Sequence, residues 1–263
     1  MMGPADESRP GSSPDARSGN LVPEAEVAEM FGRIAPAYDR LNTLMTAGLD
    51  GGWRRAAVRA AGLRPGDAAL DVACGTGKLA AALARQVGPF GRVVGIDLAP
   101  TMIRIARRRH RDLVQLRFVE GNALALPFDD DSFDAATIAF GLRNLSDFGA
   151  GLAEMRRVVR PGGRVVCLEL TTPRPAWWGR IFLATFRRLA PAAAALFGFG
   201  PTYRYLPASL EGFPSVPALT RAMSDAGLEP ILQRRHGLGS VALHVGVVPG
   251  GPTGRPPRGA GRP

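Results

Sequence analysis

Short apolar runs alternate with amphipathic stretches through the middle of the chain. Apolar runs bounded by glycine, proline or polar residues are typical of buried parallel strands, whereas apolar residues at helical spacing indicate helices. The predicted strands are 68–73, 92–96, 116–119, 133–140 and 164–170, and the helices between them are 79–87, 102–109 and 148–159. This alternation predicts an α/β fold with a doubly wound, mostly parallel sheet.

The pattern changes near the C-terminus. A helix at 216–226 is followed by two consecutive strands, at about 230–236 and 241–248. Only a short segment that contains Gly237 and Gly239 separates them. Two strands joined so closely are expected to pair antiparallel, as a hairpin.

The two ends of the chain have a different composition from its middle. Residues 1–22 are polar and rich in glycine, serine and proline, and residues 249–263 consist mainly of proline, glycine and arginine. Such segments cannot bury a core, so we expect two disordered tails around one domain at 23–248. We find no signal peptide and no run of about 18 apolar residues, which predicts a cytoplasmic protein.

The main chemical signal follows the first predicted strand. Asp71 ends that strand, and Gly75-Thr76-Gly77 leads into the next helix. Glycines allow a sharp turn close to a ligand, and the amides at a helix N-terminus favour an anionic group. Asp97, 20 residues after Gly77, can accept both hydroxyls of a ribose. By itself the pattern suits the carboxylate of a methyltransferase cofactor or the pyrophosphate of a dinucleotide.

Three further features favour a methyltransferase. Asp71 could help to hold the ammonium group of its cofactor. Asn122 and Ala123 follow the third strand, where an amide side chain and a backbone amide could read an adenine edge. The segments 131–134 and 156–164 lead into the fourth and fifth strands. The Pro-Gly-Gly in the second segment is by itself an ordinary turn, and it supports a methyltransferase only because it occurs together with the other motifs.

These segments resemble the class I S-adenosylmethionine-dependent methyltransferases. More narrowly, the chain resembles the ubiquinone/menaquinone biosynthesis C-methyltransferase family over about 26–248. The narrower resemblance rests on stretches at the N-terminus, after the fourth strand and near the C-terminus. They are Met30–Asn42 with Trp53-Arg54, Phe140-Gly141-Leu142-Arg143-Asn144, Tyr203–Ser209 with Phe213-Pro214 and Ala226-Gly227, and Val241–His244.

The resemblance implies a seven-stranded mixed sheet with one antiparallel strand. It also implies methyl transfer from S-adenosylmethionine to a ring carbon of a prenylated quinol. Demethylmenaquinol is favoured over a ubiquinone precursor, because arginine-rich, lysine-poor composition is typical of high-GC bacteria that use menaquinone. A methyltransferase for another small aromatic or polyketide metabolite, and a nicotinamide-dependent or non-catalytic cofactor-binding protein, are the alternatives.

The expected site residues follow from the motifs and the resemblance. Arg143 and Asn144 are expected to orient the ring oxygen or a water beside it, and Tyr38 to close over the cofactor. Arg143 cannot serve as a conventional base, since its pKa is too high. Tyr203 and Arg204 are expected to line the substrate pocket. The expected cofactor-binding residues are Asp71, Gly75, Thr76, Gly77, Asp97, Asn122, Ala123 and Ala139.

Two positions depart from the pattern of this family. The residue after Gly77 is usually acidic there and is Lys78 in this chain, and Ala139 stands where serine is frequent. Lys78 removes a contact that the resemblance implies with the cofactor ammonium. It can weaken affinity, shift the site or be a lysine exposed to solvent, and we favour the last interpretation.

Charge and composition indicate the partners. The net charge is +10, but only one of the 33 basic residues is a lysine, so the charge reflects a coding bias and is not taken as a sign of nucleic-acid binding. The stretch 177–189 is apolar on one side and basic on the other, which is typical of a helix at a membrane surface or of one that covers the sheet. We expect peripheral membrane contact and no metal site, and homo-oligomerisation is left open. The two cysteines fit a reducing compartment.

Overall fold

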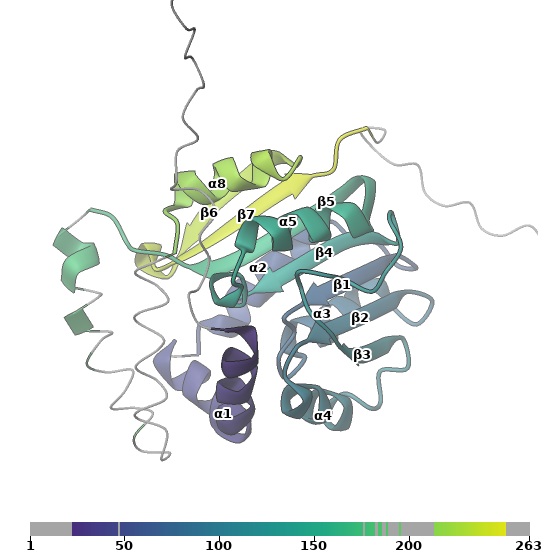
Figure 1. The fold of residues 1–263 in the computed structure, drawn as a ribbon, viewed down its shortest axis with the longest axis horizontal. Coiled ribbons are helices and arrows are strands. Elements are labelled where there is room, and N and C mark those ends of the chain that lie inside the picture. Colours follow the sequence, from purple (N-terminus) through teal and green to yellow (C-terminus); the bar gives the residue numbers. More distant parts are fainter. Residues whose placement is uncertain are drawn as a thin grey trace, which may run out of the picture.

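The computed structural model of the chain describes residues 23–46, 48–175, 177–181 and 213–250, with the single positions 184, 185, 188 and 195. The two predicted tails therefore lie almost wholly outside the described residues. Strands in this part of the chain form one seven-stranded sheet in the order β3-β2-β1-β4-β5-β7-β6 (Figure 1). The strands are β1 (Ala68–Val72), β2 (Arg92–Asp97), β3 (Leu116–Glu120), β4 (Phe133–Ala139), β5 (Val159–Leu170), β6 (Glu229–His236) and β7 (Val241–Val247).

The sheet is parallel except at β7. Strands β1 to β5 pair in parallel, and β7 runs antiparallel to both β5 and β6. The predicted doubly wound sheet and its C-terminal hairpin are confirmed. The strand order reverses between β1 and β4, and open α/β sheets bind ligands outside the carboxyl ends of the strands at such a switch point.

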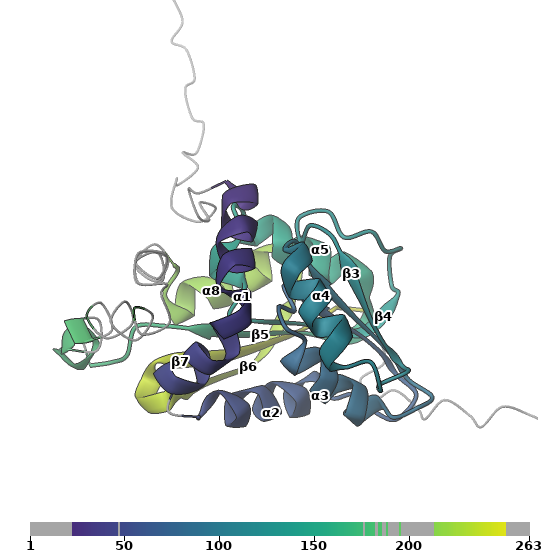
Figure 2. The ribbon, with the colours of Figure 1, turned by 90° about the horizontal axis from the view of Figure 1, so that it is seen from below.

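Helices cover both faces of this sheet. They are α1 (Glu24–Met45), α2 (Asp50–Ala61), α3 (Lys78–Val87), α4 (Pro100–Arg109), α5 (Phe148–Val158) and α8 (Val216–Asp225). One apolar core joins α2, α3 and α4 to the sheet, and a second joins α5 and α8 to its other face. Figure 2 shows α2 and α3 below the sheet and α1 running across its edge. The edge that α1 crosses is the one where a ligand site is expected.

The structure differs from the predicted pattern at β5. The sequence predicted a helix to 159, a turn at 161–163 and a strand from Arg164, but β5 begins at Val159. The Pro-Gly-Gly segment forms an irregularity inside the strand, because the pairing with β4 shifts register there. The backbone of this segment is hydrogen-bonded to Val248, the residue after β7. The Gly162 N–H donates to Val248 O at 2.8 Å, and the Val248 N–H donates to Gly163 O at 3.0 Å.

The two N-terminal helices were not predicted from periodicity. Pro36 lies inside α1, and Gly51 and Gly52 lie in the first turn of α2. These residue types lower intrinsic helix stability, so the local signal is weak. Tertiary packing supplies the missing stability: Leu41 of α1 and Ala57 of α2 are fully buried.

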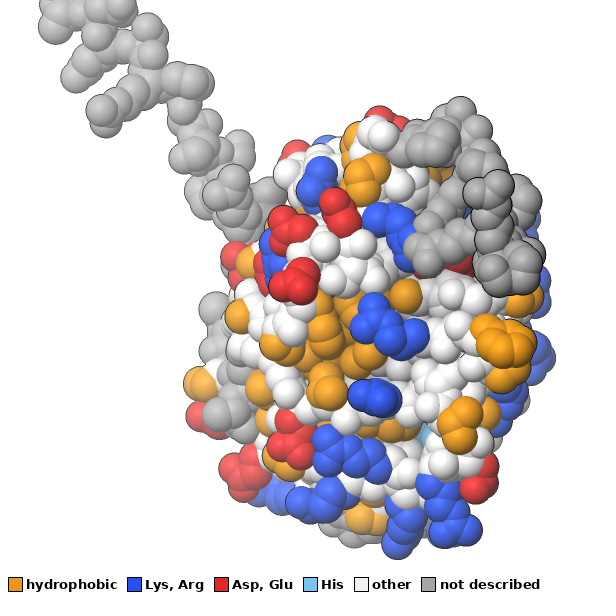
Figure 3. Space-filling view, turned by 90° about the vertical axis from the view of Figure 1, so that its right-hand side faces the viewer, with side chains coloured by type: hydrophobic (Ala, Val, Ile, Leu, Met, Phe, Trp, Pro, Cys, Tyr) orange, Lys and Arg blue, Asp and Glu red, His pale blue; other side chains and the backbone are white. Residues whose placement is uncertain are grey.

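The basic helix α4 lies at the surface. Figure 3 shows Lys and Arg side chains gathered at the lower end of the molecule, where α4 lies. Part of this charge holds neighbouring segments, since Arg107 donates to the Phe118 carbonyl at 2.8 Å and Arg109 pairs with Asp39. No described helix is long and apolar enough to cross a membrane.

Candidate active site

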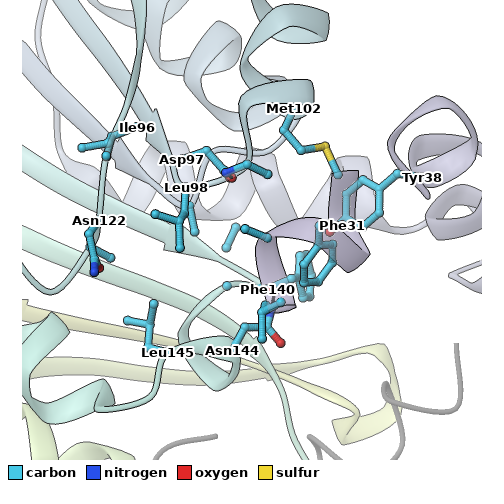
Figure 4. A pocket seen from close by; sticks show the side chains of 18 residues that line it. Phe31, Tyr38, Ile96, Asp97, Leu98, Met102, Asn122, Phe140, Asn144 and Leu145 are labelled. Atoms are coloured by element: carbon cyan, nitrogen blue, oxygen red, sulfur yellow. Dashed lines mark hydrogen bonds between the residues drawn. The ribbon is translucent and has the colours of Figure 1, made fainter. Parts of the chain in front are cut away.

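A cavity opens at the carboxyl edge of the sheet, between the ends of β1, β2 and β4 and the inner side of α1 (Figure 4). Its empty space, including the solvent in its open mouth, is about 720 Å³. Apolar and aromatic side chains dominate its wall. The lining residues are Val27, Ala28, Phe31, Tyr38, Ala73, Ile96, Asp97, Leu98, Ala99, Met102, Gly121, Asn122, Ala123, Ala139, Phe140, Gly141, Asn144 and Leu145.

Many residues singled out in the sequence meet at this cavity. Those that line it are Tyr38, Asp97, Asn122, Ala123, Ala139 and Asn144, whereas Asp71, Gly75, Thr76, Gly77 and Arg143 do not. Tyr203 and Arg204 lie outside the described residues, so their expected role in the substrate pocket stays a prediction. Phe31, Met102 and Leu145 also line the cavity and were missed, because an apolar residue near a strand or on a helix gives no signal distinct from core packing.

Asp97 ties the glycine turn to the second strand. One carboxylate oxygen accepts the Gly75 N–H at 2.7 Å, and the other accepts the Ala99 N–H at 2.9 Å. Gly75 and Gly77 have positive φ values of 56° and 81°, which favour glycine. A carboxylate oxygen can accept two hydrogen bonds, so each oxygen of Asp97 can accept one more from a ligand in the cavity. Burial raises the pKa of Asp97 despite the amides of Ala99 and Gly75.

Asp71 lies deeper, below the N-terminus of α3. It is 1% exposed, and one of its oxygens accepts the Thr137 hydroxyl at 2.7 Å. Its other oxygen is buried and has no hydrogen-bond partner in the described part of the chain. Burial raises the pKa of Asp71 to about 7, against the hydrogen bond from Thr137 and the charge of Arg54. An unused buried acceptor behind the turn suits a cationic group brought by a ligand.

Tyr38 closes the cavity from α1. Its ring packs edge-on against Phe31, with centroids 5.8 Å apart, and lies over Gly75, where an added Cβ would be 4.0 Å from Tyr38 Cε1. Burial raises the pKa of Tyr38, although a hydrogen bond with Asn42 and the charge of Arg143 lower it. Tyrosine is protonated at neutral pH in any case, so Tyr38 is a neutral side chain in the wall of the cavity.

Arg143 is held by a buried acid. Its guanidinium pairs with Glu169 at the end of β5 and also donates to the Phe140 carbonyl at 2.9 Å. Both side chains of the pair are at most 4% exposed. These contacts hold the loop that carries Phe140 and Asn144, and the expected role of Arg143 in orienting the ring oxygen or a water beside it stays a prediction. Glu169 was missed, and its only sequence signal is an acid inside an otherwise apolar strand.

The expectation of a solvent-exposed Lys78 is wrong, because its side chain is only 30% exposed and is paired. Its ammonium lies 3.4 Å from Asp39 Oδ1 and 3.7 Å from Asp50 Oδ2. The helix dipole disfavours a cation at the first residue of a helix. The two nearby carboxylates compensate for this effect at Lys78. Among the described residues, no cluster of three metal-ligating side chains is found.

The chain resembles known methyltransferases in sequence and fold. Residues 20–248 match the ubiE/COQ5 methyltransferase family. The chain is 44% identical to the demethylmenaquinone methyltransferase of Thermus thermophilus, over 84% of this chain and 100% of that one. For the protein of that name from Bacillus cytotoxicus the identity is 38%, over 86% and 97%. The solved geranyl diphosphate C-methyltransferase from Streptomyces coelicolor shares the fold, with a TM-score of 0.57 at 20% identity over 76% of this chain and 79% of that one.

The buried carboxyl of Asp71 predicts a pH-dependent stability. Its folded pKa of about 7 lies above the ordinary 3.8, so the folded chain holds the proton more tightly than the unfolded chain. Its contribution to the free energy of unfolding is full below about pH 4 and is lost as the pH rises to about 7. Asp71→Asn should remove this loss, which amounts to at most about 4 kcal/mol. Urea unfolding across this pH range checks it, and a constant difference between variant and parent would contradict it.

The Arg143–Glu169 pair predicts a separation of stability from activity. Glu169→Gln leaves a buried guanidinium without its counter-charge and should destabilise the protein by about 3–5 kcal/mol. A double variant, Arg143→Met with Glu169→Leu, should regain most of that stability, since apolar replacements of buried pairs are often neutral. It should still lose turnover, because the loop is no longer fixed. Chemical denaturation and a methyl-transfer assay check both, and full activity of the double variant would refute the role of the pair.

Proposed function

Because the chain belongs to the ubiE/COQ5 methyltransferase family, we propose that it transfers a methyl group from S-adenosylmethionine to a ring carbon of demethylmenaquinol, which gives menaquinol. The relatives from Thermus thermophilus and Bacillus cytotoxicus, which match over nearly their whole length, carry the name demethylmenaquinone methyltransferase. The observation that carries the proposal is the cavity at the switch point, where Asp97 and Asn122 meet Tyr38 and Asn144.

The residues of one half of the cavity suit the cofactor. Asp97 has acceptor capacity for two ribose hydroxyls, and Asn122 and Ala123 lie where an adenine edge can be read. The amides at the start of α3 suit a carboxylate, and the unused oxygen of Asp71 suits an ammonium group. When bound, the cofactor supplies a methyl group that is already activated on a sulfonium, so the protein has to bind, orient and exclude water.

The other half of the cavity suits an aromatic ring. Phe140, Tyr38 and Phe31 provide apolar surface, and Asn144 adds an amide. The chain's residues must hold a ring carbon in line with the methyl group, at about 3–3.5 Å. Tyr38, which is protonated at neutral pH, donates to the ring oxygen on which charge develops. Arg143 and Glu169 act through the position of the loop. We extend the substrate pocket to Tyr203 and Arg204 on the basis of the sequence resemblance.

The alternative of another small aromatic or polyketide substrate loses its main support. It rested on Lys78, which departs from the family pattern in the cofactor turn. The ion pairs of Lys78 with Asp39 and Asp50 give that residue a role outside the choice of substrate.

A substrate with a prenyl tail resides in a membrane, and we propose that the sheet edge beside the cavity contacts the bilayer. The large apolar side chains of Trp177, Ile181 and Leu238 are 59%, 49% and 81% exposed. The Trp178 indole donates to the Leu238 carbonyl at 3.3 Å and so joins the two segments. Exposed Arg180 adds positive charge, and such a mixture of aromatic and basic side chains favours an anionic interface.

The cofactor assignment is tested by calorimetry. The parent protein should bind S-adenosylhomocysteine and show no binding of NAD. Asp97→Asn removes the charge that ribose hydroxyls are expected to meet, so the affinity should fall roughly 10- to 100-fold, as for the loss of a hydrogen bond to a charged group. Binding of NAD alone would overturn the proposal.

The substrate is tested separately, in a strain that lacks the gene. Demethylmenaquinone should accumulate in that strain, and an unchanged quinone profile would exclude this substrate.

The membrane proposal is tested by flotation with vesicles that contain phosphatidylglycerol. The parent protein should float with them, whereas a variant with Trp177→Ser and Leu238→Ser should float markedly less, since its exposed apolar area is removed. Phe90→Ser is the matched control, because Phe90 is 92% exposed in the turn before β2, at the opposite edge of the parallel strands. Equal flotation of both variants would contradict the proposed contact face.

A further inference from the structure

Lys78 is the only lysine in the chain and the first residue of α3. A cation is unfavourable at that end of a helix. Two carboxylates from elsewhere in the chain compensate for it, Asp39 on α1 and Asp50 on α2. The lysine therefore links three helices at the turn beside the cofactor cavity.

Asp39 is the centre of this cluster. It accepts the Thr76 hydroxyl at 3.0 Å and pairs with both Lys78 and Arg109. Burial alone would raise its pKa, but the hydrogen bond from Arg109 and the charge of Lys78 outweigh burial and lower it. Asp39 is thus charged at neutral pH, and it ties α1 to both the cofactor turn and α4.

The second carboxylate is that of Asp50, which also pairs with Arg54 of its own helix. Helices α1 and α2 are joined by the short connection 46–49, in which Gly48 has a φ of 78°. Asp39 lies on one side of this connection and Asp50 on the other, and Asp50 is 5% exposed. Lys78 contacts both carboxylates and so bridges the two sides of the connection.

The position of α1 matters because it forms one wall of the cavity. Val27, Ala28, Phe31 and Tyr38, all on α1, line the space. A ligand enclosed by this wall can leave more easily when α1 moves away from the turn. A different ion pair, between Arg33 and Glu29, is exposed and joins two residues of α1 itself.

We propose that Lys78 is a positioning residue that acts as an electrostatic latch: its ion pairs with Asp39 and Asp50 hold α1 closed over the cavity. The part of this inference that concerns ligand exchange rests on the proposed function, whereas the closure of α1 does not. Loss of the lysine charge leaves α1 held by its apolar packing on α4 and, through Asp39, by Thr76 and Arg109, so α1 opens more frequently and the cofactor dissociates faster.

The experiment compares Lys78→Met with the matched control Arg33→Met, which removes an exposed ion pair between two residues of α1. Hydrogen exchange of the α1 amides is measured on each full-length protein without ligand. Lys78→Met should speed exchange in α1 roughly three- to tenfold, the size expected when two partly exposed ion pairs are lost, with β1 and β4 unchanged. Arg33→Met should leave α1 near the parent rate, and Lys78→Arg should restore it.

The dissociation of S-adenosylhomocysteine, followed by stopped flow, gives the second measurement. Its rate should rise in Lys78→Met by a similar factor and return toward the parent value in Lys78→Arg. Equal α1 exchange in Lys78→Met and Arg33→Met would overturn the latch.

If Lys78→Met does not fold, hydrogen exchange of the parent protein is measured at increasing salt concentration. The α1 amides must then exchange faster as the ion pairs are screened, and an unchanged exchange rate would refute the latch. If the parent does not bind the ligand, the proposed function fails, while the exchange data still decide on the latch.

Discussion

The carboxylate of Asp97 holds the site together. It accepts backbone N–H groups from both sides, Gly75 in the turn after β1 and Ala99 at the start of α4. Hydrogen bonds to a charged acceptor are about twice as strong as neutral ones, so this side chain holds the glycine turn after β1 against the end of β2, next to the point between β1 and β4 where the strand order reverses. Asp97 also lines the cavity, so the side chain that holds the turn is in a position to meet a ligand.

Two other charged groups extend this arrangement to segments far away in the chain. Glu169, from the last parallel strand, fixes Arg143 and thereby the loop that carries Phe140 and Asn144. Asp39 fixes α1, which carries Tyr38. In each case a buried or half-buried charge is compensated by partners from other elements, so that a misplaced segment would leave it unpaired. The apolar wall of the cavity is thus positioned by polar interactions behind it.

The sequence predicted what depends on local pattern. The βα alternation predicted β1 to β5, and Asp97 after the glycine turn lies at the cavity as the motif led us to expect. It did not predict α1 and α2, because Pro36, Gly51 and Gly52 weaken the helical signal that tertiary packing overrides. It also missed Glu169 and misjudged Lys78, since the partner of a charge lies 26 or more positions away in the chain for Arg143–Glu169 and Lys78–Asp39 alike. The family resemblance indicated a role for Arg143, but only the fold shows that its ion-pair partner is Glu169.

A crystal structure of the protein with S-adenosylhomocysteine would show whether this cavity holds the cofactor. The ribose hydroxyls should lie on the Asp97 carboxylate and the adenine beside Asn122. The sulfur should face the space between Tyr38 and Asn144. A nucleoside bound outside this cavity, or a sulfur that points away from Tyr38 and Asn144, would contradict this assignment.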